Sequence, residues 1–221
     1  MKLSFRHSLK RVFVPLILVL ALLALYLYWD LQQETRPGSI REAVPVEHFT
    51  LANGLNVVVM PSTRTDAVVH MLVVKAGAAD DPYGKTGIAH YLEHLMFTGS
   101  ANYPEGSYDG TIQRLGGEQN AYTTKDYTAY HAMVAREHLS TVMAMEADRL
   151  QNLLFDPTKI TRELKVITEE RNQRIENSPA AQFMEQLTAL TFLNHPYHHP
   201  TIGWAEDMAT LTGEDAKNFF N

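Results

Sequence analysis

The sequence contains no cysteine, so disulfide scaffolds, thiolate metal sites and cysteine nucleophiles are all excluded. Any metal ion must therefore be bound by histidine, aspartate or glutamate. Positive charge is scarce after residue 11, because four of the 19 basic residues lie in the first 11 positions and all 25 acidic residues follow them. This excess of acid argues against a nucleic-acid partner. Apolar residues make up 45% of the 221 positions, which is enough for a sizeable core and excludes a disordered chain.

The beginning of the chain has the pattern of a targeting segment. Residues 12–29 carry no charge, and their length is near the lower limit for a helix that crosses a bilayer. Basic residues over 1–11 and acids at Asp30 and Glu34 predict a cytoplasmic N-terminus and an exported remainder, on the periplasmic side in a bacterium. A cleaved signal peptide is the alternative, although small residues of the A-x-A type are missing after the run. We therefore expect a single transmembrane anchor over 12–29 and a polar linker over 30–45.

Residues 46–221 form the expected globular part, with strands first and helices after them. Asn53-Gly54 predicts a hairpin with a tight two-residue turn, in which both residues have positive φ angles. Residues 67–76 are dense in β-branched side chains and predict a mostly buried strand. Further strands are expected over 119–124 and 127–134, and helices over 86–97, 136–154, 158–174, 179–193 and 213–221. This order indicates an α+β fold, a largely antiparallel sheet covered by helices on one face.

One expected helix carries two histidines and a glutamate at the spacing of a metal site. At 100° per residue, His94 lies about 40° from His90, and Glu93 lies about 60° to the other side, so all three share one face. Two imidazoles one turn apart can bind a single ion, and this order is the inverted zincin motif H-x-x-E-H. The motif fixes only three positions, so a polar helix face with two ordinary histidines remains an alternative explanation.

A later helix, expected over 158–174, offers a third ligand. Glu163 and Glu170 fall on its apolar side, whereas Glu169 faces water. A buried ionised carboxylate is costly unless a cation or a metal compensates its charge. Two explanations therefore remain open at this point: the carboxylates serve a metal site, or they form buried salt bridges to arginines, for instance Arg149 or Arg114.

The motif and its surroundings resemble the pitrilysin, insulinase and mitochondrial processing peptidase family of zinc metallopeptidases. His90-Tyr91-Leu92-Glu93-His94 is followed by Glu170 at 76 positions beyond the second histidine, as in that family. Four blocks resemble family blocks in the same order, and the likeness extends from about residue 49 to residue 221. These blocks are Gly87–Ser100, Gly116–Tyr130, Glu163–Glu170 and His195–Met208.

The resemblance implies a zinc-dependent endopeptidase that hydrolyses peptides or unfolded proteins. One Zn²⁺ per chain would activate a water molecule, and Glu93 would be the general base that takes its proton. The other implied roles are as follows: His90, His94 and Glu170 as zinc ligands, Glu163 as the hydrogen-bond partner of a ligand histidine, and Asn120 and Ala121 on a strand that binds substrate.

Members of the family usually have a second, homologous half that closes over the peptide, and this chain resembles only the first half. We therefore expect the domain over 46–221 to be incomplete at its C-terminal end and to work with a homologous second half or partner subunit. The main alternative is a non-catalytic, membrane-tethered binding or assembly subunit of the same fold. Such relatives typically lose the motif, which is intact here. A lyase that shares the motif also requires a metal-binding cysteine, and the absence of cysteine excludes it.

Overall fold

The computed structural model describes residues 22, 23, 25, 26, 28 and 45–221, and the chain divides into two compact units after Arg64. The expected basic segment over 1–11, most of the expected anchor over 12–29 and nearly all of the expected linker lie outside the described residues. Within the described part of the chain, no helix is both long enough and apolar enough to cross a membrane.

In the first unit, β1 (Glu47–Thr50) and β2 (Asn56–Val59) form the expected antiparallel hairpin. The tight two-residue turn predicted for it is wrong. Thr50 pairs with Asn56, so a longer loop joins the strands, and only Gly54 in it has a positive φ angle, of 88°. The amide of Gly54 donates to the carbonyl of Leu51 at 2.9 Å, so the turn is centred on residues 52 and 53 with ordinary φ angles, and Gly54 takes the left-handed conformation after it.

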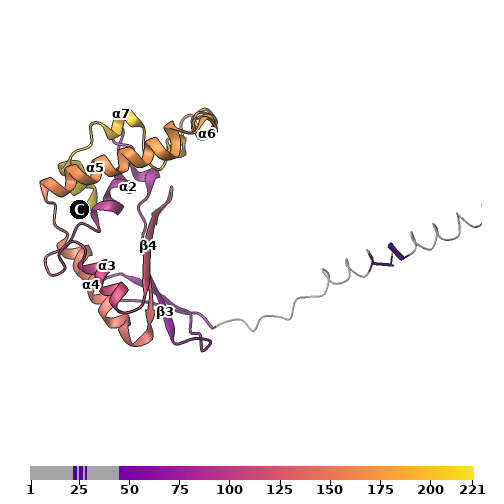
Figure 1. Ribbon diagram of the computed structural model, residues 1–221, viewed down its shortest axis with the longest axis vertical. Coiled ribbons are helices and arrows are strands. Elements are labelled where there is room, and N and C mark those ends of the chain that lie inside the picture. The colour runs from indigo at the N-terminus through magenta and orange to yellow at the C-terminus, as the bar shows by residue number, and fades with distance from the viewer. Residues whose placement is uncertain (1–21, 24, 27, 29–44) are drawn as a thin grey trace, which may run out of the picture. The chain divides into compact units, whose positions relative to one another are not determined.

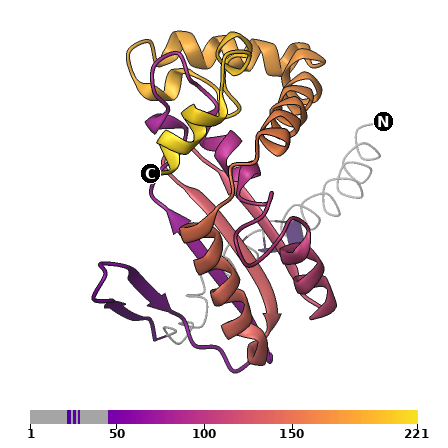
Figure 2. The same ribbon diagram turned by 90° about the vertical axis from the view of Figure 1, so that its left-hand side faces the viewer.

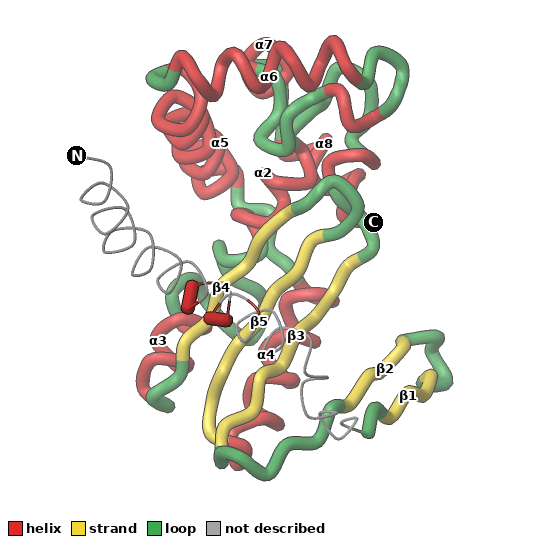
Figure 3. The backbone as a smooth tube through the Cα atoms, turned by 90° about the vertical axis from the view of Figure 1, so that its right-hand side faces the viewer, coloured by secondary structure: helices red, strands yellow, loops and turns green. Residues whose placement is uncertain are grey.

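The second unit contains a three-stranded antiparallel sheet in the order β3-β5-β4, shown face-on in Figure 3. Its strands are β3 (Ala67–Val74), β4 (Glu118–Thr123) and β5 (Thr128–Ala135). A short turn joins β4 to β5, and Thr123 at the end of β4 pairs with Thr128 at the start of β5. Because β5 lies in the centre, β4 is an edge strand of this sheet.

Helices α3 (Ser107–Arg114) and α4 (Leu139–Asn152) lie on one face of this sheet, as Figures 1 and 2 show. The expectation that β3 is mostly buried is wrong, because its side chains alternate between the two faces. Val69, Met71 and Val73 point away from α4 and are 47–58% exposed. A run of consecutive apolar residues predicts a strand covered on both faces, but α3 and α4 cover only one.

Helix α2 (Ile88–Leu95) lies at the end of the sheet and packs against α5 (Pro157–Arg171). Its apolar side chains, Ile88, Tyr91 and Leu95, form a core with Ile167 of α5 and with residues of the last helices. Helix α5 begins where the sequence predicts. The side chain of Asp156 accepts hydrogen bonds from the amides of residues 158 and 159, and proline occupies the first helical position. The apolar packing of α2 against α5 brings the histidine motif close to the carboxylates of α5.

The other expected helices are also present, with ends shifted by a few residues. A π-helical turn, η3 (Asn172–Glu176), continues α5. It is followed by α6 (Pro179–Thr191), α7 (Ala205–Met208) and α8 (Gly213–Phe220), with short 3₁₀ segments at Ala78–Asp80, Arg136–His138 and Pro196–His198. Helices α3 and α7 were not expected, since Gly110 lies inside α3 and α7 is a single turn of four residues.

Candidate metal centre

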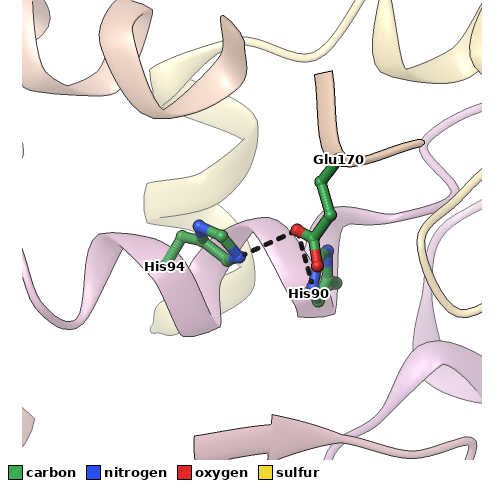
Figure 4. Close-up of side chains that lie close together, drawn as sticks. All are labelled: His90, His94 and Glu170. Carbon is green, nitrogen blue, oxygen red and sulfur yellow. Dashed lines mark ion pairs between the residues drawn. The ribbon is translucent and has the colours of Figure 1, made fainter. Parts of the chain in front are cut away.

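Three side chains from α2 and α5 converge on one point, as Figure 4 shows. Oε2 of Glu170 lies 3.7 Å from Nε2 of His90 and 3.4 Å from Nε2 of His94. One ligand atom from each of the three residues can be chosen so that all lie within 4.8 Å of one another. Tetrahedral ligands at about 2.0–2.1 Å from a zinc ion lie about 3.4 Å apart. The spacing therefore suits a single divalent ion with only small adjustments.

The protonation of this group also fits a metal ion better than ion pairs. Burial lowers the pKa of His90 to about 3, and the positive charges of His94 and Arg174 act in the same direction. A neutral imidazole offers a lone pair to a metal and cannot form a salt bridge. Oε2 of Glu170 is buried and accepts no hydrogen bond within the described structure. Leaving such an oxygen unpaired is costly, and a bound cation would remove that cost.

The other oxygen of Glu170 is paired with an arginine that sequence reasoning did not identify. Oε1 of Glu170 lies 2.7 Å from the guanidinium of Arg174, which follows it by four positions. Residues four apart are neighbours on a helix, so this spacing could have indicated the pair. Arg174 leaves the second oxygen of Glu170 directed towards the histidines.

The alternative of buried salt bridges to arginines is correct in the type of partner, because Glu163 pairs with Arg162 and Glu170 with Arg174, but both arginines are exposed. The two arginines named as examples, Arg149 and Arg114, are wrong. Arg149 is buried beneath the sheet, where it pairs with Glu146 at 2.7 Å and stacks over three aromatic rings. Arg114 donates a hydrogen bond to Thr111 on its own helix.

Glu163 lies on the other side of the His94 ring. Its Oε2 is 3.6 Å from Nδ1 of His94, while Nε2 of the same ring faces Glu170. Its Oε1 accepts hydrogen bonds from Arg162. A carboxylate beside Nδ1 favours a proton on that nitrogen and leaves Nε2 free to bind a metal. Glu169 is exposed, as the helical pattern predicts, and accepts hydrogen bonds from Asn172 and Gln173 of the following turn η3.

Glu93 is buried on the same helix face, and its carboxylate is held by a strand rather than by its own helix. Oγ1 of Thr123, the last residue of β4, donates a 2.5 Å hydrogen bond to Oε2 of Glu93. Burial raises the pKa of Glu93, and the hydrogen bond from Thr123 opposes that rise. Thr123 lies 30 positions from Glu93, so no local sequence signal could have indicated the contact.

These residues line a cavity of about 490 Å³ that extends along β4. Both residues that the resemblance places at the substrate, Asn120 and Ala121, line it. Asn120 is exposed, and its side-chain oxygen accepts a 2.9 Å hydrogen bond from the amide of Ala121. The amide of Thr124 donates to the carbonyl of Tyr127, and hydrogen-bonded pairs alternate along an antiparallel ladder, so the amide of Ala121 points away from β5, towards the free edge of the sheet. The candidate metal centre and an open strand edge therefore share one cavity.

Helix α2 is anchored at its N-terminus by a buried aspartate. The carboxylate of Asp81 accepts hydrogen bonds from the amides of Gly87 at 2.7 Å and Ala89 at 3.0 Å. Burial raises the pKa of Asp81 to about 7, although both amides act in the opposite direction. Asp81 thus positions the first turn of α2, which precedes His90.

This pKa predicts a pH-dependent stability that can be isolated with Asp81→Asn. The folded-state pKa of Asp81 lies above its ordinary value of 3.8, so its contribution to stability is complete below about pH 4 and is lost as the pH rises towards 7. The free energy of unfolding of the wild type, relative to Asp81→Asn, should fall by up to about 4 kcal/mol across this range. Urea unfolding of the metal-free chain at several pH values measures the difference. Parallel curves for the two proteins would contradict this pKa.

Comparison with known proteins assigns the fold to a family. The model of the family described as Insulinase (Peptidase family M16) matches residues 57–204. The chain is 34% identical over 174 residues to "Zinc protease PqqE" of Helicobacter pylori, covering 78% of this chain and 39% of that protein. It is 30% identical over 170 residues to a probable mitochondrial-processing peptidase subunit beta of Arabidopsis thaliana, covering 77% and 32% of the two chains. The chain thus spans about a third to two fifths of the length of these relatives.

Solved structures agree with the sequence relatives. The crystal structure of a protease from Helicobacter pylori superposes with a TM-score of 0.77 at 33% identity, over 80% of this chain and 42% of that one. The periplasmic protease PqqL from Escherichia coli gives a TM-score of 0.71 at 25% identity, over 79% and 20% of the two chains. These matches confirm the resemblance inferred from the motif and its surrounding blocks. Because the family model covers well over half of the sequence, this protein belongs to the insulinase family of peptidases, peptidase family M16.

Proposed function

We propose that the protein is a zinc-dependent endopeptidase, with His90, His94 and Glu170 as the metal ligands and Glu93 as the general base. The observation that carries this proposal is the convergence of one ligand atom from each of the three residues within 4.8 Å, beside Glu93 in a common cavity. The names of the relatives, zinc proteases and a processing peptidase, support the same reaction class.

The chain's own residues divide the chemistry between them. A zinc ion held at this centre would polarise the peptide carbonyl and lower the pKa of a water molecule towards neutrality. Glu93 accepts the proton of the attacking water and then delivers it to the leaving amine. Burial raises the pKa of Glu93 above its ordinary value, which helps the carboxylate to hold the proton between these two steps. Glu163, beside Nδ1 of His94, keeps Nε2 of that ring free to act as a ligand.

The substrate in this proposal is an extended peptide or an unfolded protein that adds to the free edge of β4. Main-chain hydrogen bonds to an exposed sheet edge bind peptides with little regard to their sequence. The amide of Ala121 points to this edge and already donates a hydrogen bond there, to the side-chain oxygen of Asn120. A peptide carbonyl would take the place of the Asn120 side chain, and the scissile bond would lie next to Glu93.

A homologous second half, in the same polypeptide or in a partner subunit, is the proposed partner. The relatives with which the chain aligns are more than twice as long as the aligned part. Helix α6 carries an apolar row, Phe183, Leu187 and Leu190, whose side chains are 44–68% exposed. Exposed apolar surface of this kind is typical of a surface that another domain covers.

Export is proposed from the charge distribution of residues 1–34, and the Escherichia coli relative PqqL is described as periplasmic.

Metal content and its link to hydrolysis test the proposed function. The purified chain should bind one zinc ion, and removal of the metal with dipicolinate should abolish cleavage of an unstructured peptide, because the attacking water is no longer activated. Adding zinc back should restore cleavage, and cobalt or manganese should be compared, since histidine and carboxylate ligands accept all three ions. A chain that binds no zinc after reconstitution would refute the proposal.

A further inference from the structure

We infer that Thr123 is a positioning residue that orients the carboxylate of Glu93 for proton transfer. This inference rests on the proposed function, in which Glu93 is the general base. The 2.5 Å hydrogen bond from Oγ1 of Thr123 to Oε2 of Glu93 is the one hydrogen bond that reaches this carboxylate within the described part of the chain. With Oε2 occupied by Thr123, Oε1 is the oxygen that remains available for the proton of a water molecule.

An ionised Glu93 has no hydrogen to donate, so Thr123 is the donor in this pair, and the hydroxyl of Thr128 is the other acceptor within reach. Oγ1 of Thr128 lies 3.4 Å from Oγ1 of Thr123, and the Thr128 hydroxyl donates a 2.9 Å hydrogen bond to the carbonyl of Ala76. Each hydroxyl carries a single hydrogen. Because the hydrogen of Thr128 is used by Ala76, Thr128 can only accept from Thr123. The Thr123 hydrogen is directed instead to Glu93, the closer and more strongly accepting oxygen.

The sheet holds the hydroxyl of Thr123 in place. Thr123 is the last residue of β4 and pairs with Thr128 of β5, so its backbone belongs to an antiparallel ladder. The side chain of threonine is stiff at χ1, which limits the positions that Oγ1 can reach. Glu93 has a long side chain with more rotatable bonds, and helix α2 alone leaves its carboxylate free to turn. Catalytic groups must be held within about 0.5 Å of the productive geometry.

The position of Thr123 also couples the base to the strand beside which the peptide is proposed to bind. Ala121 and Thr123 lie on the same face of β4, two residues apart, and both line the cavity. The amide proposed to bind the peptide backbone and the hydroxyl that orients the base therefore belong to one rigid strand. Any shift of the edge strand moves both together, which keeps the base aligned with a bound peptide.

Three variants separate this role from a structural one. Thr123→Val removes the hydroxyl and keeps the branched shape, Thr123→Ser restores a hydroxyl, and Thr124→Val is the control in the same hairpin. The hydroxyl of Thr124 donates to the carbonyl of Tyr127 and not to Glu93. The zinc dissociation constant should stay within about threefold of wild type in all three variants, because the hydroxyl of Thr123 touches none of the proposed ligands.

The discriminating measurement is the affinity of the zinc-loaded chain for acetohydroxamate, which does not depend on turnover. This probe chelates the metal and gives its hydroxyl proton to a nearby base. Thr123→Val should weaken its binding by about tenfold to a hundredfold, the change expected for one hydrogen bond to a charged group. Thr123→Ser should restore binding to within about threefold of wild type. In peptide hydrolysis, the same loss should appear in kcat with KM unchanged.

Each outcome decides between the inference and the proposed function. Unaltered acetohydroxamate binding by Thr123→Val, failure of Thr123→Ser to restore it, or an equal loss in Thr124→Val would each overturn the role of Thr123. Loss of zinc from Thr123→Val would also overturn it, since the residue would then support the ligands. A wild-type chain that binds no zinc would instead refute the proposed function, and the role of Thr123 would fall with it.

Discussion

Replacing Glu93 with glutamine is expected to lower kcat for peptide hydrolysis by about 10²–10⁴-fold, the usual contribution of a general base. Glutamine keeps the size of the side chain and can still accept the hydrogen bond from Thr123, but it cannot take a proton from water. The zinc content should remain at one ion per chain, because Glu93 is not among the three converging ligands.

The measurement compares hydrolysis of an unstructured peptide by the zinc-loaded wild type, Glu93→Gln and Glu169→Gln. Glu169 is a matched control, since it is an exposed carboxylate outside the cavity. Full activity in Glu93→Gln would refute its role as the base. A different outcome is a wild type that binds zinc but fails to cleave peptides, both alone and with a homologous second half. In that case a non-catalytic binding or assembly subunit becomes the better explanation.

Replacing Glu170 with alanine is expected to lower zinc affinity by well over 100-fold. Loss of an outer hydrogen-bond partner alone typically reduces metal affinity about 10–100-fold, and removal of a direct ligand costs more. Glu170 supplies the only carboxylate among the three converging residues, and its Oε2 lies within 3.7 Å of both histidine Nε2 atoms. The remaining pair of histidines would leave the ion with two protein ligands.

A graded series makes this prediction sharper. Zinc affinity, measured by competition with a chelator of known strength, should fall most in Glu170→Ala, by about 10–100-fold in Glu163→Gln, and hardly at all in Glu169→Ala. The three residues lie within two turns of one helix, so they share its stability and differ mainly in the direction of the side chain. A larger loss in Glu169→Ala than in Glu170→Ala would contradict the proposed ligand set.

Sequence periodicity was sufficient where a feature depends on a single element. The helical spacing of His90, Glu93 and His94 places them on one face whatever surrounds the helix. The same helical period places Glu170 on the apolar side of its helix and Glu169 on the side that faces water. The capping residue and proline that begin α5 also act within a few residues of one another. The family resemblance was available for the same reason, because it depends on ordered local blocks and on one fixed separation.

Features that depend on two distant segments were not available from periodicity. The stacking of Arg149 over the rings of Phe97, Tyr108 and Tyr130, the hydrogen bond from Thr123 to Glu93 and the exposure of one face of β3 all depend on which element packs against which. The hairpin shows the same limit at short range, since Asn53-Gly54 predicts a two-residue turn, whereas the backbone closes a longer loop in which Gly54 alone has a positive φ angle.

The sequence by itself determined the family, the α+β order of elements and the residues that face a common side of each helix, because these follow from the geometry of a single chain segment. Only the tertiary structure decided that Oε2 of Glu170 lies between two imidazoles and that the hydroxyl of Thr123 reaches Glu93. Those distances are set by the packing of α2 against α5 and against the end of β4, where apolar side chains far apart in the sequence are buried together.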